Sequence, residues 1–286
     1  MPISGSILNS WSHHHSAKAS IQAHTSIREA FNDYALQDKD FKYNVFLQGS
    51  YKNDTNLRLD SDVDIVVQLL EELRPKVATL SKDQLKDNQA HKLMYDRWRS
   101  FRSQVLKALR AKYGNGVVAT KRKCIKVEKG EIHASADVVV TVKCGAGLAF
   151  YLPDEHRWVV SYPEQHHARG LKKAEATSSR FKRTIRMFKA TRNHMEENHS
   201  IKEGIAPSYF IECLLYNVPD KLFIPRLDQS YAGIVEYLKT ANLQGFKCQN
   251  GIHKLFSTSK DLWSQNEARI FIRALEQLWK KWPEYT

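Results

Sequence analysis

Residues 49–69 read GSYKNDTNLRLDSDVDIVVQL, an acidic motif that leads directly into an apolar run. The alternation of DVDIVVQL (residues 62–69) predicts a strand, on which Asp62 and Asp64 share one face. Their positions are then about 6.6 Å apart along the strand. Two negative charges at that distance are unfavourable unless a cation lies between them. The stretch therefore predicts a cation site at the start of a buried strand.

The acidic motif could also belong to a calcium-binding loop or to a charged sheet edge. Asp60, Asp62 and Asp64 resemble the opening of a calcium-binding loop, but that loop needs glycine at its sixth position, where this chain has Ile65. A sheet edge protected by charge explains one aspartate better than three. Magnesium, which proteins hold with a few carboxylates and substrate phosphates, suits the motif better.

Two further segments extend the predicted site. Asp137 opens ADVVVTV (residues 136–142), which is β-branched enough for a central strand beside the first. Three carboxylates would suit two metal ions, one activating a hydroxyl nucleophile and one stabilising a leaving pyrophosphate. Upstream, Gly49 and Ser50 end the predicted strand YNVFLQGS in a turn. Glycine lets the backbone approach a ligand closely, and the serine hydroxyl and free N–H groups can bind phosphate.

The front half of the chain is expected to mix sheet and helix, and the back half to be helical. Helices are predicted over residues 16–34, with Ile21 on the apolar side, and over residues 83–113, with a buried stripe. The stripe comprises Met94, Trp98, Phe101, Val105 and Leu109. Further strands are expected at residues 117–120, 123–128 and 136–142. This pattern indicates an α+β fold.

A boundary is predicted near residues 158–170, where Pro163 and Gly170 interrupt the pattern. Beyond it, helices are expected over residues 179–194, from Pro207 at the first helical position, and from the capping box of Ser264 and Glu267 towards the C-terminus. We therefore expect a catalytic domain at residues 1–165 and a helical lobe at residues 166–286.

Composition restricts the class of protein. The 286 residues are 42% hydrophobic and 26% charged, which is typical of a globular protein. No apolar run approaches the ~18 residues of a membrane span, and the N-terminal segment lacks the pattern of a signal peptide, so a cytoplasmic protein is expected. Four scattered cysteines predict neither a disulfide framework nor a zinc site. The net charge of +13 predicts attraction to a polyanion or to nucleoside triphosphates, or else reflects a basic solvated surface.

The stretch at residues 49–69 resembles the active-site signature of the polymerase-β-like nucleotidyltransferases. More narrowly, the chain resembles the bacterial relatives of cyclic GMP–AMP synthase, the CD-NTases of anti-phage (CBASS) defence, and clade E among them. The segments that carry this resemblance span nearly the whole chain: WSHHHSAKAS, ADVVVTV, RWVVSYP, TIRMFK, APSYFIECLLYNVPD and KCQNG. The family joins two ribonucleoside triphosphates into a cyclic dinucleotide that activates a separate effector protein.

The resemblance implies a nucleotidyltransferase sheet braced by a long N-terminal helix and faced by a helical lobe. It also implies roles for individual residues. Asp62, Asp64 and Asp137 match the metal-binding triad, which holds two Mg²⁺ ions, with Mn²⁺ as a substitute. Gly49 and Ser50 match the phosphate turn.

In the helical half, the resemblance matches Lys189 to a lysine that faces the donor triphosphate. It matches Ser208 to a phosphate-binding serine and Tyr209 to a tyrosine that stacks on a nucleobase. The residues offer some independent support, because Ser208 lies at a predicted helix start, where free N–H groups favour anions. Lys182, Arg186 and Lys189 form a cationic stripe, for which a solvated helix face is the alternative.

Ser161 bears on the product. Clade E enzymes that use a pyrimidine nucleotide carry asparagine in the corresponding stretch, and an amide can offer a pyrimidine edge a donor and an acceptor together. Serine offers less, so we expect a purine pair made from ATP and possibly GTP: cyclic di-AMP first, a cyclic AMP–GMP ring second. The alternatives are a linear-product, oligoadenylate-type or other nucleotidyltransferase, or a basic nucleic-acid-binding module.

Two features of the wider family are not found in the sequence. The zinc thumb of the animal enzyme has no counterpart, so a nucleic-acid activator is not implied by the basic charge. The last residues, WPEYT, lack the small-residue tail that regulation by conjugation favours.

Overall fold

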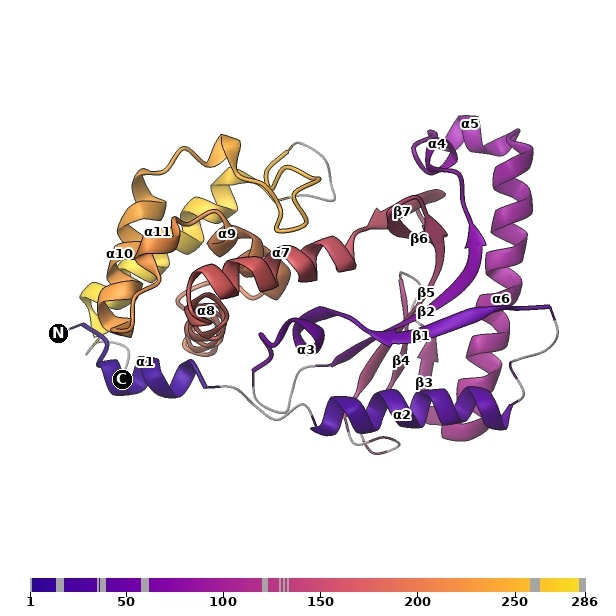
Figure 1. Ribbon diagram of the computed structural model, residues 1–286, viewed down its shortest axis with the longest axis horizontal. Coiled ribbons are helices and arrows are strands. Elements are labelled where there is room, and N and C mark those ends of the chain that lie inside the picture. Colours follow the sequence, from indigo (N-terminus) through magenta and orange to yellow (C-terminus); the bar gives the residue numbers. More distant parts are fainter. Residues whose placement is uncertain are drawn as a thin grey trace. The chain divides into compact units, whose positions relative to one another are not determined.

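The computed structural model describes residues 2–13, 18–34, 36, 40–57, 62–119, 123–128, 130, 132, 134–257 and 263–282. The chain forms two compact units (Figure 1). The first, called here the sheet unit, comprises Ser16–Lys52 and Arg58–Pro163. The second, called the helical unit, comprises Met1–His15, Asn53–Leu57 and Glu164–Thr286. An α+β fold is confirmed.

Among the described residues, the sheet unit has a seven-stranded mixed sheet. Five strands follow the order β1-β2-β5-β4-β3, and β6 pairs with both β5 and β7. β2 and β5 are parallel, and the other pairs are antiparallel. The strands are β1 (Tyr43–Leu47), β2 (Val63–Glu72), β3 (Val117–Ala119), β4 (Cys124–Val127), β5 (Ala136–Cys144), β6 (Gly147–Leu152) and β7 (Arg157–Ser161).

Two helices, α2 (Lys18–Asp33) and α6 (Gln89–Tyr113), contact each other and the strands. Figure 1 shows α6 running alongside the sheet. The helices and the strands share one apolar core, which includes Ile65 of β2 and Val138 of β5. Because side chains alternate along a strand, the residues between these core positions face away from the helices. That other face carries the acidic residues.

The predicted stripe of α6 is confirmed for Trp98, Phe101, Val105 and Leu109, which are all buried, and Met94 is partly buried against the same core. The prediction of a single helix over residues 83–113 is wrong. The chain instead forms α5 (Lys82–Lys86) and then α6, because the side chain of Asn88 accepts a hydrogen bond from the backbone of His91 and starts a new helix. A short helix α4 (Pro75–Ala78) precedes them, and Gly114–Gly116 forms a 3₁₀ turn after α6.

In α2, the placement of Ile21 on the buried side is wrong, because this side chain is 57% exposed. The buried face of α2 instead carries Ala23, Ile27, Ala30 and Phe31. Their spacing of four, three and one keeps them on one side of the helix, whereas Ile21 lies outside that stripe.

The helical unit contains six α-helices among its described residues, together with two 3₁₀ turns at Asp220–Leu222 and Leu243–Gly245. Its core gathers large buried side chains such as Phe188, Phe210, Tyr231 and Phe271. The helices are α1 (Gly5–Trp11), α7 (Pro163–Ala176), α8 (Arg180–Glu197), α9 (Ser208–Tyr216), α10 (Leu227–Thr240) and α11 (Gln265–Lys280).

Three details of the helical unit differ from the sequence prediction. Pro163 and Gly170 do not interrupt the structure, since α7 begins at Pro163 and contains Gly170. Pro207 is the N-cap of α9, one residue before the predicted position. Residues 1–15, expected with the catalytic domain, belong to the helical unit, where Leu8 enters the core. The capping box of Ser264 and Glu267 is confirmed.

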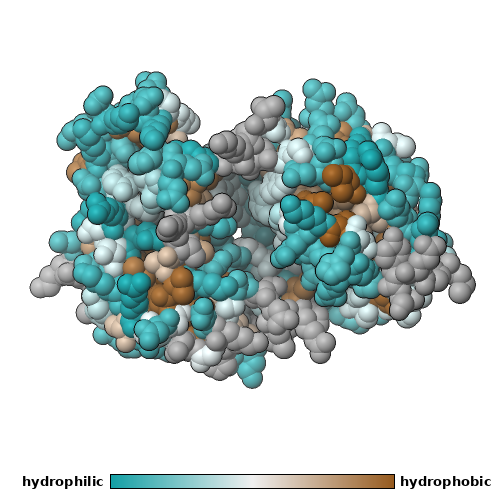
Figure 2. Space-filling model, turned by 180° about the vertical axis from the view of Figure 1, so that it is seen from behind, coloured by the Kyte–Doolittle hydropathy of each residue, from teal (hydrophilic) through white to brown (hydrophobic). Residues whose placement is uncertain are grey.

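Hydrophilic residues cover most of the face shown in Figure 2, with small apolar patches between them. This agrees with the charged fraction of the sequence. Within the described ranges, none of the helices combines the length and the apolar character needed to cross a membrane.

Candidate active site

Two of the predicted carboxylates lie on neighbouring strands of the sheet unit. Asp64 of β2 and Asp137 of β5 are direct partners in the parallel register. Partner residues on adjacent strands project from the same face, about 4.8 Å apart in the backbone. Asp62 lies two residues before Asp64 and therefore points to that face as well. The structure thus places the three predicted carboxylates on one face of the sheet, near the start of β2 and β5.

Gly49 lies against this group. Its φ is +68°, and a Cβ atom built on it would lie 1.9 Å from Oδ2 of Asp64. Only glycine fits there, because any side chain would displace the carboxylate. The backbone N–H of Gln48 also donates to the carbonyl of Asp64, at 3.0 Å. The predicted turn at Gly49 and Ser50 is in fact the first part of a short helix, α3 (Gly49–Asn53).

Asp62 has two partners within the sheet unit. Ser135 donates a short hydrogen bond to Oδ1, and Nζ of Lys126 lies 3.4 Å from Oδ2. Attraction to Asp62, with a smaller contribution from Asp137, raises the pKa of Lys126. Lys126 is the register partner of Asp137 on β4, so its ammonium lies on the carboxylate face. Asp60 lies outside the described residues.

These residues suit a divalent ion in type and position, because hard cations prefer carboxylate oxygens. In the described part of the chain, however, no three His, Cys, Asp or Glu side chains gather closely enough to enclose an ion. The ammonium of Lys126 provides positive charge beside Asp62 instead. The donor set therefore fits a metal, provided that Asp62 exchanges its lysine for the ion.

A second acidic site lies inside the helical unit. The carboxylate of Glu212, on α9, is 4% exposed and has four partners. Oε1 accepts hydrogen bonds from Nζ of Lys189 and from Oγ1 of Thr55, both at 2.6 Å. Oε2 accepts from Nδ2 of Asn53 at 3.3 Å and lies 2.8 Å from Nε2 of His166. Because an ionised carboxylate only accepts, His166 is the donor of that bond.

Burial by itself would raise the pKa of Glu212. The ammonium of Lys189 and the ring of His166 outweigh this, so the pKa lies well below its ordinary value. The group is therefore an ionised carboxylate in the interior, compensated by charge and by hydrogen bonds. Such compensation is what a buried charge requires.

Lys189 is almost fully buried, with 2% exposure. Its ammonium contacts Oε1 of Glu212 and both the carbonyl and the Oγ1 of Thr55, at 2.6, 3.1 and 3.3 Å. An ammonium has three protons to donate, and these three acceptors account for them. The predicted contact of Lys189 with a triphosphate stays a prediction, and it would require the lysine to leave at least one of these partners.

The cationic stripe of α8 is not a solvated face, so that alternative is wrong. Arg186 is only 7% exposed. Its guanidinium donates to the carbonyl of Asp54 at 2.6 Å and to the carbonyl of Ser12 at 2.9 Å. Lys182 lies 3.9 Å from the Asp54 carboxylate. The stripe therefore binds residues 54 and 55 of the helical unit.

Ser208 and Tyr209 open α9, as predicted. The Tyr209 ring is 41% exposed and lies nearly parallel to the rings of His166 and Trp263, at centroid distances of 4.9 and 5.8 Å. Asn250 donates to its hydroxyl at 3.4 Å. These contacts fix the orientation of a partly exposed ring. The predicted stacking on a nucleobase stays a prediction, and it requires a ring face that His166 and Trp263 leave open.

Ser161 ends β7 in the sheet unit. Its hydroxyl donates to the carbonyl of its cross-strand partner Leu148, at 3.4 Å. The hydroxyl thus already has an acceptor in the backbone.

Sequence reasoning missed Glu212, His166 and Lys126. Glu212 did carry a signal, because it is the only charged residue in FIECLLY, a helix segment that is otherwise apolar. A charge at such a position must be paired. Lys126 had no comparable signal, since its approach to Asp62 depends on strand pairing.

Comparisons with known proteins show which family the chain belongs to. Residues 168–280 match the family described as the cGAS/DncV-like nucleotidyltransferase C-terminal helical domain. The cyclic UMP–AMP synthase of Rhodothermus marinus is 39% identical over 99% of both chains. The cyclic dipurine nucleotide synthase of Elizabethkingia meningoseptica is 32% identical over 63% of this chain and 65% of that protein.

Solved structures give the same result. The structure of Rhodothermus marinus CdnE c-UMP-AMP synthase with Apcpp and Upnpp has a TM-score of 0.84 and 37% identity, and the match covers 98% of each chain. The likeness extends across both units, because it covers nearly all of this chain. The chain therefore belongs to the CdnE-type cyclic nucleotide synthases, bacterial cGAS/DncV-like nucleotidyltransferases.

Proposed function

We propose that the chain joins two ribonucleoside triphosphates, one of them ATP, into a 3′,3′-cyclic dinucleotide. The observation that carries this proposal is the parallel pairing of Asp64 with Asp137, with Asp62 on the same face and Gly49 against Asp64. Polar acceptors for cations and a close backbone approach are what a triphosphate site requires. In each of two steps, a 3′-hydroxyl attacks the α-phosphate of the other nucleotide and pyrophosphate leaves.

Asp62, Asp64 and Asp137 would hold two divalent ions. These would be Mg²⁺, for which Mn²⁺ can substitute. Bound there, such ions lower the pKa of an attacking hydroxyl and neutralise charge on the leaving pyrophosphate. Lys126 holds a positive charge beside Asp62 until the substrate and its ions arrive. Gly49 keeps the Asp64 carboxylate in place by leaving it room, and Ser50 follows at the start of α3.

For the nucleotide, Ser208 supplies a hydroxyl and a free N–H at the start of α9, which favour a phosphate oxygen. Tyr209 provides a ring on which a base can stack. The hydroxyl of Tyr209 is protonated at neutral pH, as an ordinary tyrosine hydroxyl is, and burial raises its pKa further. It can therefore donate a hydrogen bond.

The product is proposed to be a purine pair, cyclic di-AMP first and a cyclic AMP–GMP ring second. Support comes from Ser161, whose hydroxyl donates to the Leu148 carbonyl. This leaves the side chain with little hydrogen-bonding capacity for the edge of a uracil base. The relatives suggest a pyrimidine-containing product instead, because the one at 39% identity is named for a UMP–AMP ring and two others for dipyrimidine rings, against one named for dipurine rings. The product would act on a separate effector in anti-phage defence, the setting of this family.

The test is to incubate the protein with Mg²⁺ or Mn²⁺ and the four ribonucleoside triphosphates, labelling one at a time. Phosphatase-resistant label from ATP, absent from an Asp62→Asn/Asp64→Asn double variant, supports the proposed cyclase. Label from UTP contradicts the inference from Ser161 but not the cyclase. A labelled product that a 3′-exonuclease degrades from a free end points to a linear oligonucleotide instead.

A further inference from the structure

The segment Asn53–Thr55 begins at the last residue of α3 and is held by three helices of the helical unit. We name the group that holds it the clasp: His166 and His167 of α7, Arg186 and Lys189 of α8, and Glu212 of α9. We propose that the clasp, with Glu212 at its centre, positions α3 and thereby the Gly49–Ser50 turn relative to the Asp64 carboxylate. This role rests on the proposed function of that turn.

Each of the three residues of the segment is hydrogen-bonded to side chains of the clasp. Asn53 binds Glu212 through its amide nitrogen and His167 through its amide oxygen, at 3.3 and 3.1 Å. The carbonyls of Asp54 and Thr55 accept from Arg186 and Lys189. Asn53 and Thr55 are buried, with 9% and 2% exposure. The segment is therefore bound by its backbone as well as by its side chains.

The backbone of the segment needs this support. Asp54 has a φ of +58°, a conformation that non-glycine residues rarely adopt. The ammonium of Lys182 and the guanidinium of Arg186 lie 3.9 and 3.6 Å from its carboxylate. Residues outside the segment thus hold the bend that ends α3.

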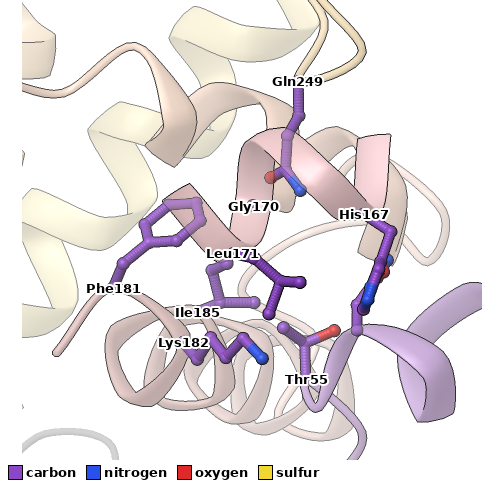
Figure 3. Close-up of a pocket in the computed structure, with 9 residues that line it drawn as sticks. Thr55, His167, Gly170, Leu171, Phe181, Lys182, Ile185 and Gln249 are labelled. Carbon is purple, nitrogen blue, oxygen red and sulfur yellow. The ribbon is translucent and has the colours of Figure 1, made fainter. Parts of the chain in front are cut away.

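Little space remains around the segment. Figure 3 shows Thr55 beside Lys182, with Leu171 of α7 pointing into the same cavity. The cavity has a volume of about 10 Å³, which is room for about one water molecule. It is also lined by Phe181 and Ile185. A displaced Thr55 would find no alternative position in so small a space.

A short helix, α3, joins the residue held by the clasp to the Gly49–Ser50 turn. α3 runs from Gly49 to Asn53, so the turn and the clasp hold opposite ends of one five-residue helix. Their separation along its axis is only about 6 Å. Asn53 is fixed by Glu212 and His167, so a change in the clasp is expected to shift Gly49 relative to Asp64.

The test uses Thr55→Val, which removes one hydroxyl and keeps the shape of the side chain. It removes the hydrogen bonds of this hydroxyl with Glu212 and with Lys189 but leaves the Lys189–Glu212 pair and the Thr55 carbonyl intact. The control is Thr191→Val, two residues after Lys189 on α8. Thr191 is equally buried, but its hydroxyl donates only to the Met187 carbonyl of its own helix.

We expect Thr55→Val to lower kcat by about 10- to 100-fold, the effect of a small misplacement of reacting groups. Its affinity for a non-hydrolysable ATP analogue should match that of Thr191→Val. Its Tm should be lower, because the buried charges of Lys189 and Glu212 each lose a partner, so kcat is compared at a temperature at which both variants are folded. Hydrogen exchange should rise at residues 49–57 in Thr55→Val alone. Equal kcat in the two variants overturns the proposal, and so does faster exchange without a fall in kcat.

The exchange measurement separates this proposal from the proposed function. If the wild type forms no cyclic product with any nucleotide, the proposed function fails. Unequal exchange at residues 49–53 would then still support the clasp as the element that holds α3, and equal exchange would overturn it.

Discussion

Two carboxylate–lysine pairs, one in each unit, differ mainly in their exposure to water. In the sheet unit, Asp62 and Lys126 are 3.4 Å apart, with 35% and 40% of their side chains exposed. In the helical unit, Glu212 and Lys189 are 2.6 Å apart and only 4% and 2% exposed. The same two chemical groups therefore meet in very different surroundings.

The difference separates a site that can exchange partners from one that cannot. A half-exposed pair gains little from its own attraction, because water solvates each charge when they part. Asp62 can therefore give up Lys126 for a metal ion at small cost. A buried pair has no such alternative, and separating it leaves an unpaired charge in the interior. We infer that the exposed pair serves chemistry and the buried pair serves position.

The largest expected effect is on stability. Glu212→Gln should lower the free energy of unfolding by about 3–5 kcal/mol, since it leaves the Lys189 ammonium buried without a counter-charge. Asp62→Asn should lower it by no more than about 1 kcal/mol. Urea unfolding of the two variants measures both values.

A double variant sharpens this prediction. Glu212→Gln with Lys189→Met removes both charges and should recover part of the loss, because no unpaired charge remains. Equal losses for Glu212→Gln and Asp62→Asn would contradict the contrast between the two pairs.

The next effect is on activity at the exposed site. Gly49→Ala should lower kcat by about 100-fold, because its Cβ would lie 1.9 Å from Oδ2 of Asp64 and must displace the carboxylate. Gly114→Ala is the matched control. Gly114 also has a positive φ, of +54°, but nothing lies within 4 Å of its Cβ position. Initial rates of product formation should fall only in the first variant. A similar fall in both would mean that backbone strain, and not the displaced carboxylate, is the cause.

Lowering the pH should reduce the contribution of the buried Glu212–Lys189 pair to the stability of the protein. The lowered pKa of Glu212 means that its contribution to stability is present above the unfolded pKa of about 4.3. That contribution is lost as the pH falls below this value. The difference in urea midpoint between wild type and Glu212→Gln should therefore shrink from pH 6 to pH 3. A difference that stays constant would show that folding does not lower the pKa of Glu212, and so that its charge is not what stabilises the protein.

The smallest effect concerns Lys126. Lys126→Gln removes the ammonium beside Asp62, so a divalent ion no longer competes with it. The Mg²⁺ concentration for half-maximal activity should fall a few-fold, because a surface ion pair contributes no more than about 1 kcal/mol. Titration of activity with Mg²⁺ measures it, with Lys143→Gln, at another exposed pair of the same sheet, as the control. A rise in the required concentration would indicate that Lys126 assists the reaction itself.

Much of the fold could be predicted from local pattern. The strand at residues 63–72 and the stripe of α6 follow from periodicity, because burial on one face repeats every two or about 3.6 residues. The break at Asn88 was missed, since a single capping side chain outweighs a continuing periodic pattern. The helix through Pro163 and Gly170 was missed for a related reason. Proline is tolerated in the first turn, and packing on Gln249 suits a glycine at position 170.

The sequence by itself determined the acidic motif, the placement of Asp62 and Asp64 on one face, and the family to which these segments belong. Those features depend on residues that are neighbours along the chain, where the geometry of a strand is enough. Tertiary structure alone decided that Asp137 pairs with Asp64 and that Gly49 leaves room for a carboxylate. It also decided that the lysine expected to face a triphosphate is buried against Glu212. Lys189 and Glu212 are 23 residues apart, and only the packing of α8 against α9 and the burial of both charges gives them a common site.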